Sequence, residues 1–341
     1  MEPSIYVPIY LEYTYTQEHG DLTEAARQLL HDDIGRHPER YATSEHAQAL
    51  LSYQRVHDRL MLQLDQLEDV IDDEEFMRKE TQLFQNARTE LFKIWHTDRF
   101  CVDAQLVDIQ LSQASLDAQL NDLMKLESQT REHLERNARG FDEDAPGFWD
   151  ASQLGDMTPA DATRTNPDMI GWLHTLEVIS QTCIASARYK PAMRYARMVM
   201  RAEGYPNHAE GTLLLALARL EDEDGFFQAA RESGADAASN PWFLLGRTLL
   251  LYKLGRKKAA QRALREFSNR CDGGAFFLLN PTYLAPYLPV RPEPRESWDL
   301  AHQAVWEADG IIMDVPDFTL WAASIDGIDA ISERFADRNG F

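Results

Sequence analysis

Apolar residues recur at every third or fourth position in the first part of the chain, which is the spacing of one face of an α-helix. One such series runs from Tyr53 to Ile71, and another runs from Leu83 to Ile94. Leucines continue the pattern across 116–134. No stretch alternates strictly between apolar and polar residues, as a half-buried β-strand would. The pattern therefore predicts an all-α fold.

The stretch 141–168 breaks this pattern. Glycine and proline interrupt it, and it holds seven Asp and Glu residues against one Arg. Such a composition is typical of a loop or linker. We expect an acidic linker or loop between two helical halves, with Phe148 and Trp149 holding it against a helix surface.

After this stretch the chain begins to repeat itself. Three similar segments start at Ala185, Ala216 and Leu250, which are 31 and 34 residues apart. Each contains the end of an apolar helix, a polar turn, and a helix with small residues. Pro206 and Pro241, 35 residues apart, each precede the first helix of a unit. A period near 34 residues with this content predicts stacked helical hairpins.

The segment WFLLGRTLLLYKLGRKKAAQRALREF at 242–267 resembles a tetratricopeptide repeat. Four positions of its first helix match the family pattern: Trp242, Leu245, Gly246 and Leu249. Three positions of its second helix match when the first helix is two residues longer than in the family: Ala260, Leu264 and Phe267. The closing proline of the family is absent, because SNRCDGG follows. Fragments at Gly20–Leu30 and Phe92–Leu111 are similar to parts of further units.

The resemblance implies a helical-hairpin repeat array, that is, an α-solenoid with a tetratricopeptide-like arrangement. One hairpin cannot bury its apolar face alone, so neighbouring hairpins must stack. The expected organisation has four parts: N-terminal helical hairpins in 1–140, the acidic linker or loop in 141–168, tetratricopeptide-like repeats in 169–270, and a C-terminal helical capping segment in 271–341.

The capping segment is expected because the last repeat of an array must have its apolar face covered. The stretch 276–324 is rich in aromatic residues, and Pro281, Pro286 and Pro289 forbid a long helix in its first part. The alternative is that these aromatic side chains form an exposed docking surface.

Charge and composition narrow the choice of partner. The net charge is −22, and residues 1–168 carry most of it. A protein this acidic is repelled by nucleic-acid phosphates and anionic lipids, so we expect neither nucleic acid nor membrane as a partner. The sequence contains no run of about 18 apolar residues, so we expect no transmembrane helix.

Cysteine usage bears on the compartment. Cys101, Cys183 and Cys271 are far apart and form no CxxC pair, so neither a disulfide framework nor a zinc site is expected. The first residues contain no basic segment before an apolar stretch, as a secretory signal would. These observations favour a cytoplasmic protein.

One region is basic. Residues 247–270 hold eight Lys and Arg residues and one acid, Glu266. In the repeat alignment, the turn at Glu221–Asp224 corresponds to the turn at 256–258. We therefore expect ion pairs between neighbouring hairpins. The alternatives are a basic patch for an acidic partner, or a contact with the acidic stretch 141–168.

One segment suggests chemistry. QLLHDDIGRHPE at 28–39 resembles the signature of HD-type metal-dependent phosphohydrolases, which would use His31 and Asp32 as metal ligands. His57–Asp58 would be a second His-Asp pair. Asp33 is an insertion relative to that signature, and the segment is equally explained as the second helix of a repeat. No other catalytic motif is present, and we expect no metal or cofactor.

These observations predict a non-catalytic protein-protein interaction module or scaffold that binds a peptide segment or helix of another protein in a concave groove. The family resemblance implies that Asn240, Phe243 and Arg247 line this groove. The alternative is that Phe243 belongs to the core and Arg247 pairs with a neighbouring acid. Two other functions remain open: the metal-dependent phosphohydrolase, and a self-associating helical scaffold, for example a homodimer, formed through 44–95.

Overall fold

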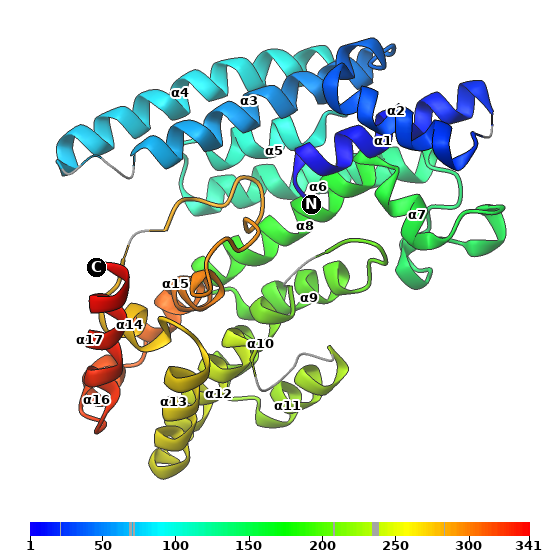
Figure 1. Ribbon diagram of the computed structural model, residues 1–341. Helices are drawn as coiled ribbons and strands as arrows, with labels where there is room; N and C mark the ends of the chain where they lie inside the picture. The colour runs from blue at the N-terminus through cyan, green and yellow to red at the C-terminus, as the bar shows by residue number, and fades with distance from the viewer. Residues whose placement is uncertain (21, 68–69, 71, 207–208, 234–238, 283) are drawn as a thin grey trace. The chain divides into compact units, whose positions relative to one another are not determined.

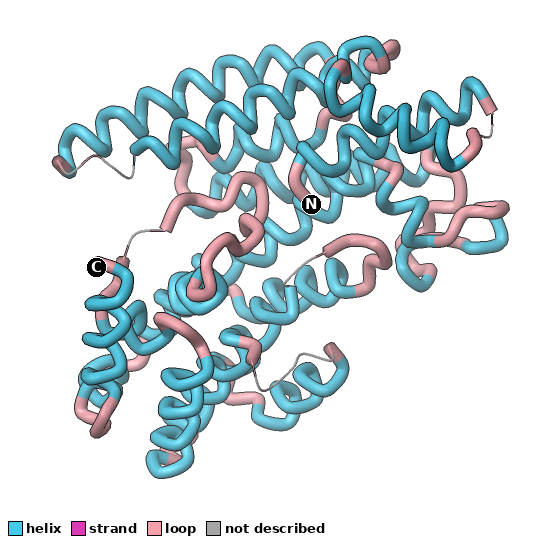
Figure 2. The backbone as a smooth tube through the Cα atoms, in the orientation of Figure 1, coloured by secondary structure: helices cyan, strands magenta, loops and turns pink. Residues whose placement is uncertain are grey.

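The computed structural model describes the chain except for residues 21, 68–69, 71, 207–208, 234–238 and 283. Within the described residues, the regular structure consists of helices α1 to α17 and short 3₁₀ helices at Pro38–Arg40, Pro146–Phe148 and Ala151–Gln153, and no β-strand is present (Figures 1 and 2). An isolated antiparallel bridge joins Phe141 to Trp149. The all-α prediction is therefore confirmed. In the described part, no helix is both long and apolar enough to span a bilayer.

The chain divides into two compact units, and it passes between them more than once. The first unit comprises Met1–Val178, Arg201–Asn207 and Tyr287–Pro292. The second comprises Ile179–Met200, His208–Pro286 and Glu293–Phe341. The segment in which a cap was expected therefore contributes residues to both units.

Most of the first unit is built from long amphipathic helices. Helix α3 packs against α1 and α4, and α5 packs against α4 and α6. In Figure 1, α3 and α4 run beside each other as a long hairpin. The helices are α1 (Pro3–His19), α2 (Glu24–Arg36), α3 (Glu45–Leu67), α4 (Asp73–Thr97), α5 (Val102–Gln110), α6 (Leu116–Asn137), α7 (Pro159–Arg164) and α8 (Pro167–Ala185), the last of which the division at Val178 crosses.

Local sequence explains where these helices begin. The side chain of Asp72 accepts a hydrogen bond from the backbone N–H of Glu75, which caps α4. Acidic residues fill the first turn of this helix, where they interact favourably with its dipole. The helix predicted from Tyr53 ends at Leu67. Ile71, which the pattern included, lies outside the described residues.

The acidic stretch 141–168 is an ordered loop that contains α7. Phe148 and Trp149 are buried, and Phe148 packs edge-to-face against Trp172 of α8 with ring centroids 5.0 Å apart. The indole N–H of Trp149 donates to Thr163 Oγ1 at 3.0 Å. Phe148 therefore holds the loop against a helix surface, as predicted.

The second unit contains successive short hairpins. Helix α10 packs against α9, α11 and α12, and α12 packs against α13 (Figure 1). Most residues of α10 and α12 are buried, whereas α11 and α13 each bury one face. The helices are α9 (Tyr189–Met200), α10 (Ala209–Arg219), α11 (Glu223–Glu232), α12 (Pro241–Lys253), α13 (Lys257–Arg270), α14 (Gly274–Leu279), α15 (Asp299–Met313), α16 (Phe318–Ala323) and α17 (Ile328–Asn339).

A glycine lets α10 and α12 approach each other closely. A Cβ atom added to Gly211 of α10 would lie only 2.6 Å from Cγ of Trp242 on α12. Trp242 is fully buried, and its indole N–H donates to Glu307 Oε2 of α15 at 2.9 Å. The small residue opposite the large one thus fits two helix backbones together.

The C-terminal part of the second unit covers these hairpins. Helix α15 packs against both α10 and α12, and α14 packs against α15 and α17. Arg219, at the end of α10, forms an ion pair with Asp314, just after α15. A described segment of the same chain therefore lies against one face of α10 and α12.

Candidate functional site

The three residues predicted to line a groove lie together at the start of α12. The Asn240 side chain accepts a hydrogen bond from the Phe243 backbone N–H at 3.0 Å and caps the helix. Phe243 is only 5% exposed and stacks on Phe226 of α11, with ring centroids 5.5 Å apart. Arg247 forms an ion pair with Glu266 of α13, and its guanidinium lies 5.3 Å from the Phe243 ring centroid. Each of these side chains thus contacts the protein's own hairpins.

The turns of neighbouring hairpins are joined by ion pairs, as the repeat alignment predicted. The Arg256 guanidinium, just before α13, donates to both carboxylate oxygens of Glu223, the first residue of α11, at 2.5 and 2.8 Å. Lys253 Nζ lies 3.3 Å from Glu221 Oε1. Lys257, from the same turn, makes a different contact. Its ammonium lies 3.0 Å from the centroid of the Tyr252 ring.

The outer face of α13 carries cations that no such contact neutralises. Lys258, Arg262 and Arg265 are exposed, and within the described part of the chain none of them has an ion pair or hydrogen bond through its side chain. They follow one another at spacings of four and three residues, so they form a row on one face of the helix. We call this row the basic stripe. The one acid of α13, Glu266, is already paired with Arg247 and Arg270.

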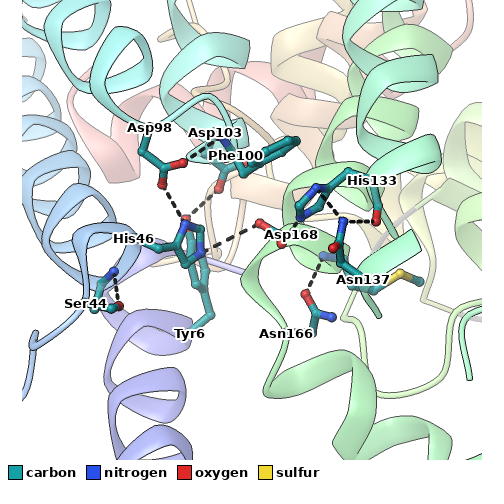
Figure 3. Close-up of polar contacts among 12 residues, drawn as sticks. Tyr6, Ser44, His46, Asp98, Phe100, Asp103, His133, Asn137, Asn166 and Asp168 are labelled. Atoms are coloured by element: carbon teal, nitrogen blue, oxygen red, sulfur yellow. Dashed lines mark hydrogen bonds and ion pairs between the residues drawn. The ribbon is translucent and has the colours of Figure 1, made fainter. Parts of the chain in front are cut away.

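A second polar cluster lies inside the first unit (Figure 3). Nδ1 of His46, in the first turn of α3, lies 2.6 Å from Oδ2 of Asp98, just after α4. Nε2 of His46 lies 3.7 Å from Oδ1 of Asp168, at the start of α8. The other oxygen of Asp168 lies 3.1 Å from Nε2 of His133 on α6. We call these four residues the imidazole–carboxylate cluster.

Electrostatics in this cluster favour a charged pair. Burial opposes the charged form of His46, but the hydrogen bond to Asp98 and the nearby Asp168 carboxylate outweigh it and raise the pKa of His46. Burial also opposes the ionised form of Asp98. The contacts with His46 and the Phe100 backbone N–H outweigh this effect, so the pKa of Asp98 is lowered. The cluster therefore links four helices through a proton-sensitive contact.

A deeper carboxylate lies next to it. Asp103 is buried, and it accepts hydrogen bonds from the Tyr6 hydroxyl at 2.7 Å and from Nδ1 of His174 at 2.9 Å. Burial alone would raise its pKa, but these partners lower it. Burial raises the pKa of the Cys101 thiol, which makes that group a poor nucleophile. These residues join helices and present no exposed reactive group.

The residues of the phosphohydrolase hypothesis are used in separate contacts. The His31 side chain is 61% exposed, and its Nδ1 lies 3.4 Å from Glu12 Oε2. Asp32 accepts a hydrogen bond from Gln28 on the same helix. His57 Nε2 lies 2.8 Å from the carbonyl oxygen of Leu288. Among the described residues, no group of three or more His, Cys, Asp or Glu side chains is arranged to hold a metal ion.

Sequence reasoning reached the basic stripe but not the imidazole–carboxylate cluster. The stripe stands out as a local excess of Lys and Arg in an acidic chain. The four cluster residues are far apart in the sequence and share no motif, so only the packing of their helices brings them together. No family model matches the chain, and neither a curated protein nor a solved structure shows significant similarity to it.

Proposed function

We propose that this chain is a non-catalytic protein-protein interaction module whose second unit is a tetratricopeptide-like hairpin array closed by a C-terminal cap. The alternation of mostly buried helices, α10 and α12, with helices that bury one face, α11 and α13, supports this arrangement. The ion pairs between successive turns support it as well. The packing of α15 and α14 on these hairpins is what a cap would do.

The observation that carries the proposal is the basic stripe. Like charges three or four residues apart on a helix destabilise it by about 0.2–0.5 kcal/mol for each pair. Solubility does not require Lys258, Arg262 and Arg265, because they reduce the magnitude of a net charge of −22. A partner that neutralises the stripe would relieve this repulsion.

The outer face of α13 is a better binding surface than the predicted groove residues. Asn240, Phe243 and Arg247 already make contacts within the second unit, so a partner could use them fully only by displacing those contacts. The stripe needs no such rearrangement.

A cytoplasmic location remains part of the proposal, and the three free, buried cysteines support it.

The experiment is a capture from cell lysate with matched variants. The test variant reverses the stripe with Lys258→Glu, Arg262→Glu and Arg265→Glu. The control variant, Arg27→Glu, Lys93→Glu and Arg99→Glu, makes the same change in net charge at exposed cations of the first unit. We expect one or more proteins to be retained by the wild type and the control variant and lost with the test variant. If the wild type retains no protein specifically, the interaction-module proposal is wrong.

A further inference from the structure

A cavity of about 620 Å³ lies where the end of α13 meets α14 and α17 in the second unit. This volume is within the range of roughly 300–1,000 Å³ typical of ligand-binding pockets. Apolar side chains line it together with three arginines and two carboxylates, Asp272 and Asp337. The lining includes Asn269, Phe276, Ile331, Arg334 and Phe335.

The basic stripe leads into this cavity. Asn269, which lines the cavity, follows Arg265 by four residues, so it continues the row formed by Lys258, Arg262 and Arg265. These four positions fall on one side of α13, because their spacings of four, three and four residues match the helical period. At 1.5 Å per residue, the row extends for roughly 17 Å.

The cavity combines apolar walls with the guanidinium of Arg334. Phe276 and Phe335 are buried in the walls of the cavity, and Ile331 is half-buried. Arg334 is exposed, and its side chain has no partner among the described residues. By contrast, Arg338 of the same helix is paired with Asp272.

We propose that the basic stripe and this cavity together bind an acidic peptide segment of a partner protein, with one large apolar side chain of that segment in the cavity. This inference rests on the proposed function and names its partner class. The peptide's carboxylates pair with Lys258, Arg262 and Arg265, and a carboxylate next to the apolar side chain pairs with Arg334. Charge complementarity selects the segment, and the cavity sets its register.

An acidic peptide fits the surface better than a nucleic acid does. Phosphates would also meet the cations of the stripe, but a chain with a net charge of −22 repels a polyanion at long range. A short peptide carries fewer charges, and its apolar side chain uses the phenylalanine walls of the cavity. A second copy of the chain is the remaining alternative, and the test distinguishes it.

The test measures fluorescence anisotropy of a labelled peptide in which glutamate alternates with serine and a phenylalanine stands near one end. Two matched peptides replace glutamate by glutamine, or phenylalanine by serine. We expect the full-length chain to bind the first peptide at low ionic strength, and each replacement to weaken binding. The variant with Lys258→Glu, Arg262→Glu and Arg265→Glu should bind it about tenfold more weakly or worse. The control with Arg27→Glu, Lys93→Glu and Arg99→Glu should bind it like the wild type.

Two exposed positions test the cavity without disturbing the core. Arg334→Glu should weaken binding of the phenylalanine peptide by about two- to fivefold. Asn269→Trp should fill the mouth of the cavity. It should reduce binding of the phenylalanine peptide to the level of the serine peptide, whose own binding should not change. Circular dichroism verifies that each variant is folded.

Several outcomes would overturn the inference. They are no binding of the glutamate peptide by the wild type, equal binding by the stripe variant, and equal binding of the glutamine peptide. Stronger binding of a single-stranded oligonucleotide would assign the stripe to nucleic acid. Self-association that is lost in the stripe variant would assign it to a second copy. None of these results concerns a protein that is captured from lysate through another surface. Failure of this inference is therefore distinguishable from failure of the proposed function.

Discussion

Nδ1 of His46 lies 2.6 Å from Oδ2 of Asp98, although 52 positions separate the two residues in the sequence. This contact ties the first turn of α3 to the residue that follows α4. Asp168 faces the other nitrogen of the same imidazole. The arrangement makes the stability of the first unit depend on the protonation of one histidine.

The pH dependence of stability should therefore change in His46→Gln. A histidine whose pKa is raised by folding stabilises the protein fully below its ordinary pKa of 6.5, and this stabilisation is lost as the pH rises through the raised value. The contribution of Asp98 to stability depends on pH in the opposite direction. Its pKa is lowered from 3.8, so its stabilisation is lost as the pH falls through the lowered value.

We expect the difference in free energy of unfolding between the wild type and His46→Gln to be largest between about pH 5 and pH 6 and to shrink above neutrality. Urea titrations at several pH values measure it. His31→Gln is the control, because this side chain is 61% exposed and its replacement should change the free energy of unfolding by less than about 0.5 kcal/mol. A His46→Gln difference that does not vary with pH would contradict the charged pair.

Close packing of α10 on α12 predicts a large effect of one methyl group. In Gly211→Ala, the new Cβ meets the Trp242 ring at 2.6 Å, and the helices must separate or the ring must move. We expect a loss of about 1–3 kcal/mol in the free energy of unfolding. Chemical denaturation followed by circular dichroism measures this loss.

Gly310 of α15 provides the matched control for this substitution. It is exposed, and nothing lies within 4 Å of the position of its missing Cβ. Gly310→Ala should be neutral or stabilise the protein by up to about 1 kcal/mol, because alanine is the better helix former. If the two substitutions had equal effects, the close approach at Gly211 would be wrong.

The burial of Phe243 predicts that this residue is needed for folding. Removal of its ring leaves a cavity between α11 and α12, so Phe243→Ala should lower the free energy of unfolding by about 3–5 kcal/mol. Leu320→Ala, at a side chain that is 73% exposed, should change it by less than about 0.5 kcal/mol. Urea unfolding of both variants is the measurement. Unchanged stability in Phe243→Ala would instead support the prediction that this ring lines a groove.

The contacts of His31 and Asp32 lead us to expect no stoichiometric metal in the purified chain, even after incubation with Mn²⁺ or Fe²⁺. Both side chains are exposed, and their nearest polar partners, Glu12 and Gln28, serve separate contacts. Elemental analysis after gel filtration tests this expectation. About one metal ion per chain, lost in His31→Ala, would instead support the phosphohydrolase hypothesis.

Local features of the fold were predictable because they depend on neighbours in the sequence. The helical period from Tyr53 to Leu67 reflects one face of α3, and Asp72 marks the start of α4 through its capping hydrogen bond. The pairing of Arg256 with Glu223 was predictable as well, because an alignment of the similar segments placed their turns at equivalent positions.

Other features depend on how distant helices pack, and no local pattern encodes them. His46 and Asp168 come from α3 and α8, and nothing near either residue indicates the other. The position of α15 against α10 and α12 was equally hidden, since a covering segment was expected but its contacts were not. Phe243 could be placed in a groove only by analogy, because a buried and a groove-lining phenylalanine look alike in sequence.

The return of Tyr287–Pro292 to the first unit has a consequence for synthesis on the ribosome. The amide of Gln110 donates to the carbonyl oxygens of Tyr287 and Pro289, and His57 contacts the carbonyl oxygen of Leu288. These side chains are made early, but their partners emerge only after most of the second unit has been translated. The first unit therefore cannot form these hydrogen bonds until residues 287–289 have been translated. The time needed to translate the intervening segment therefore sets the earliest moment at which these contacts can form.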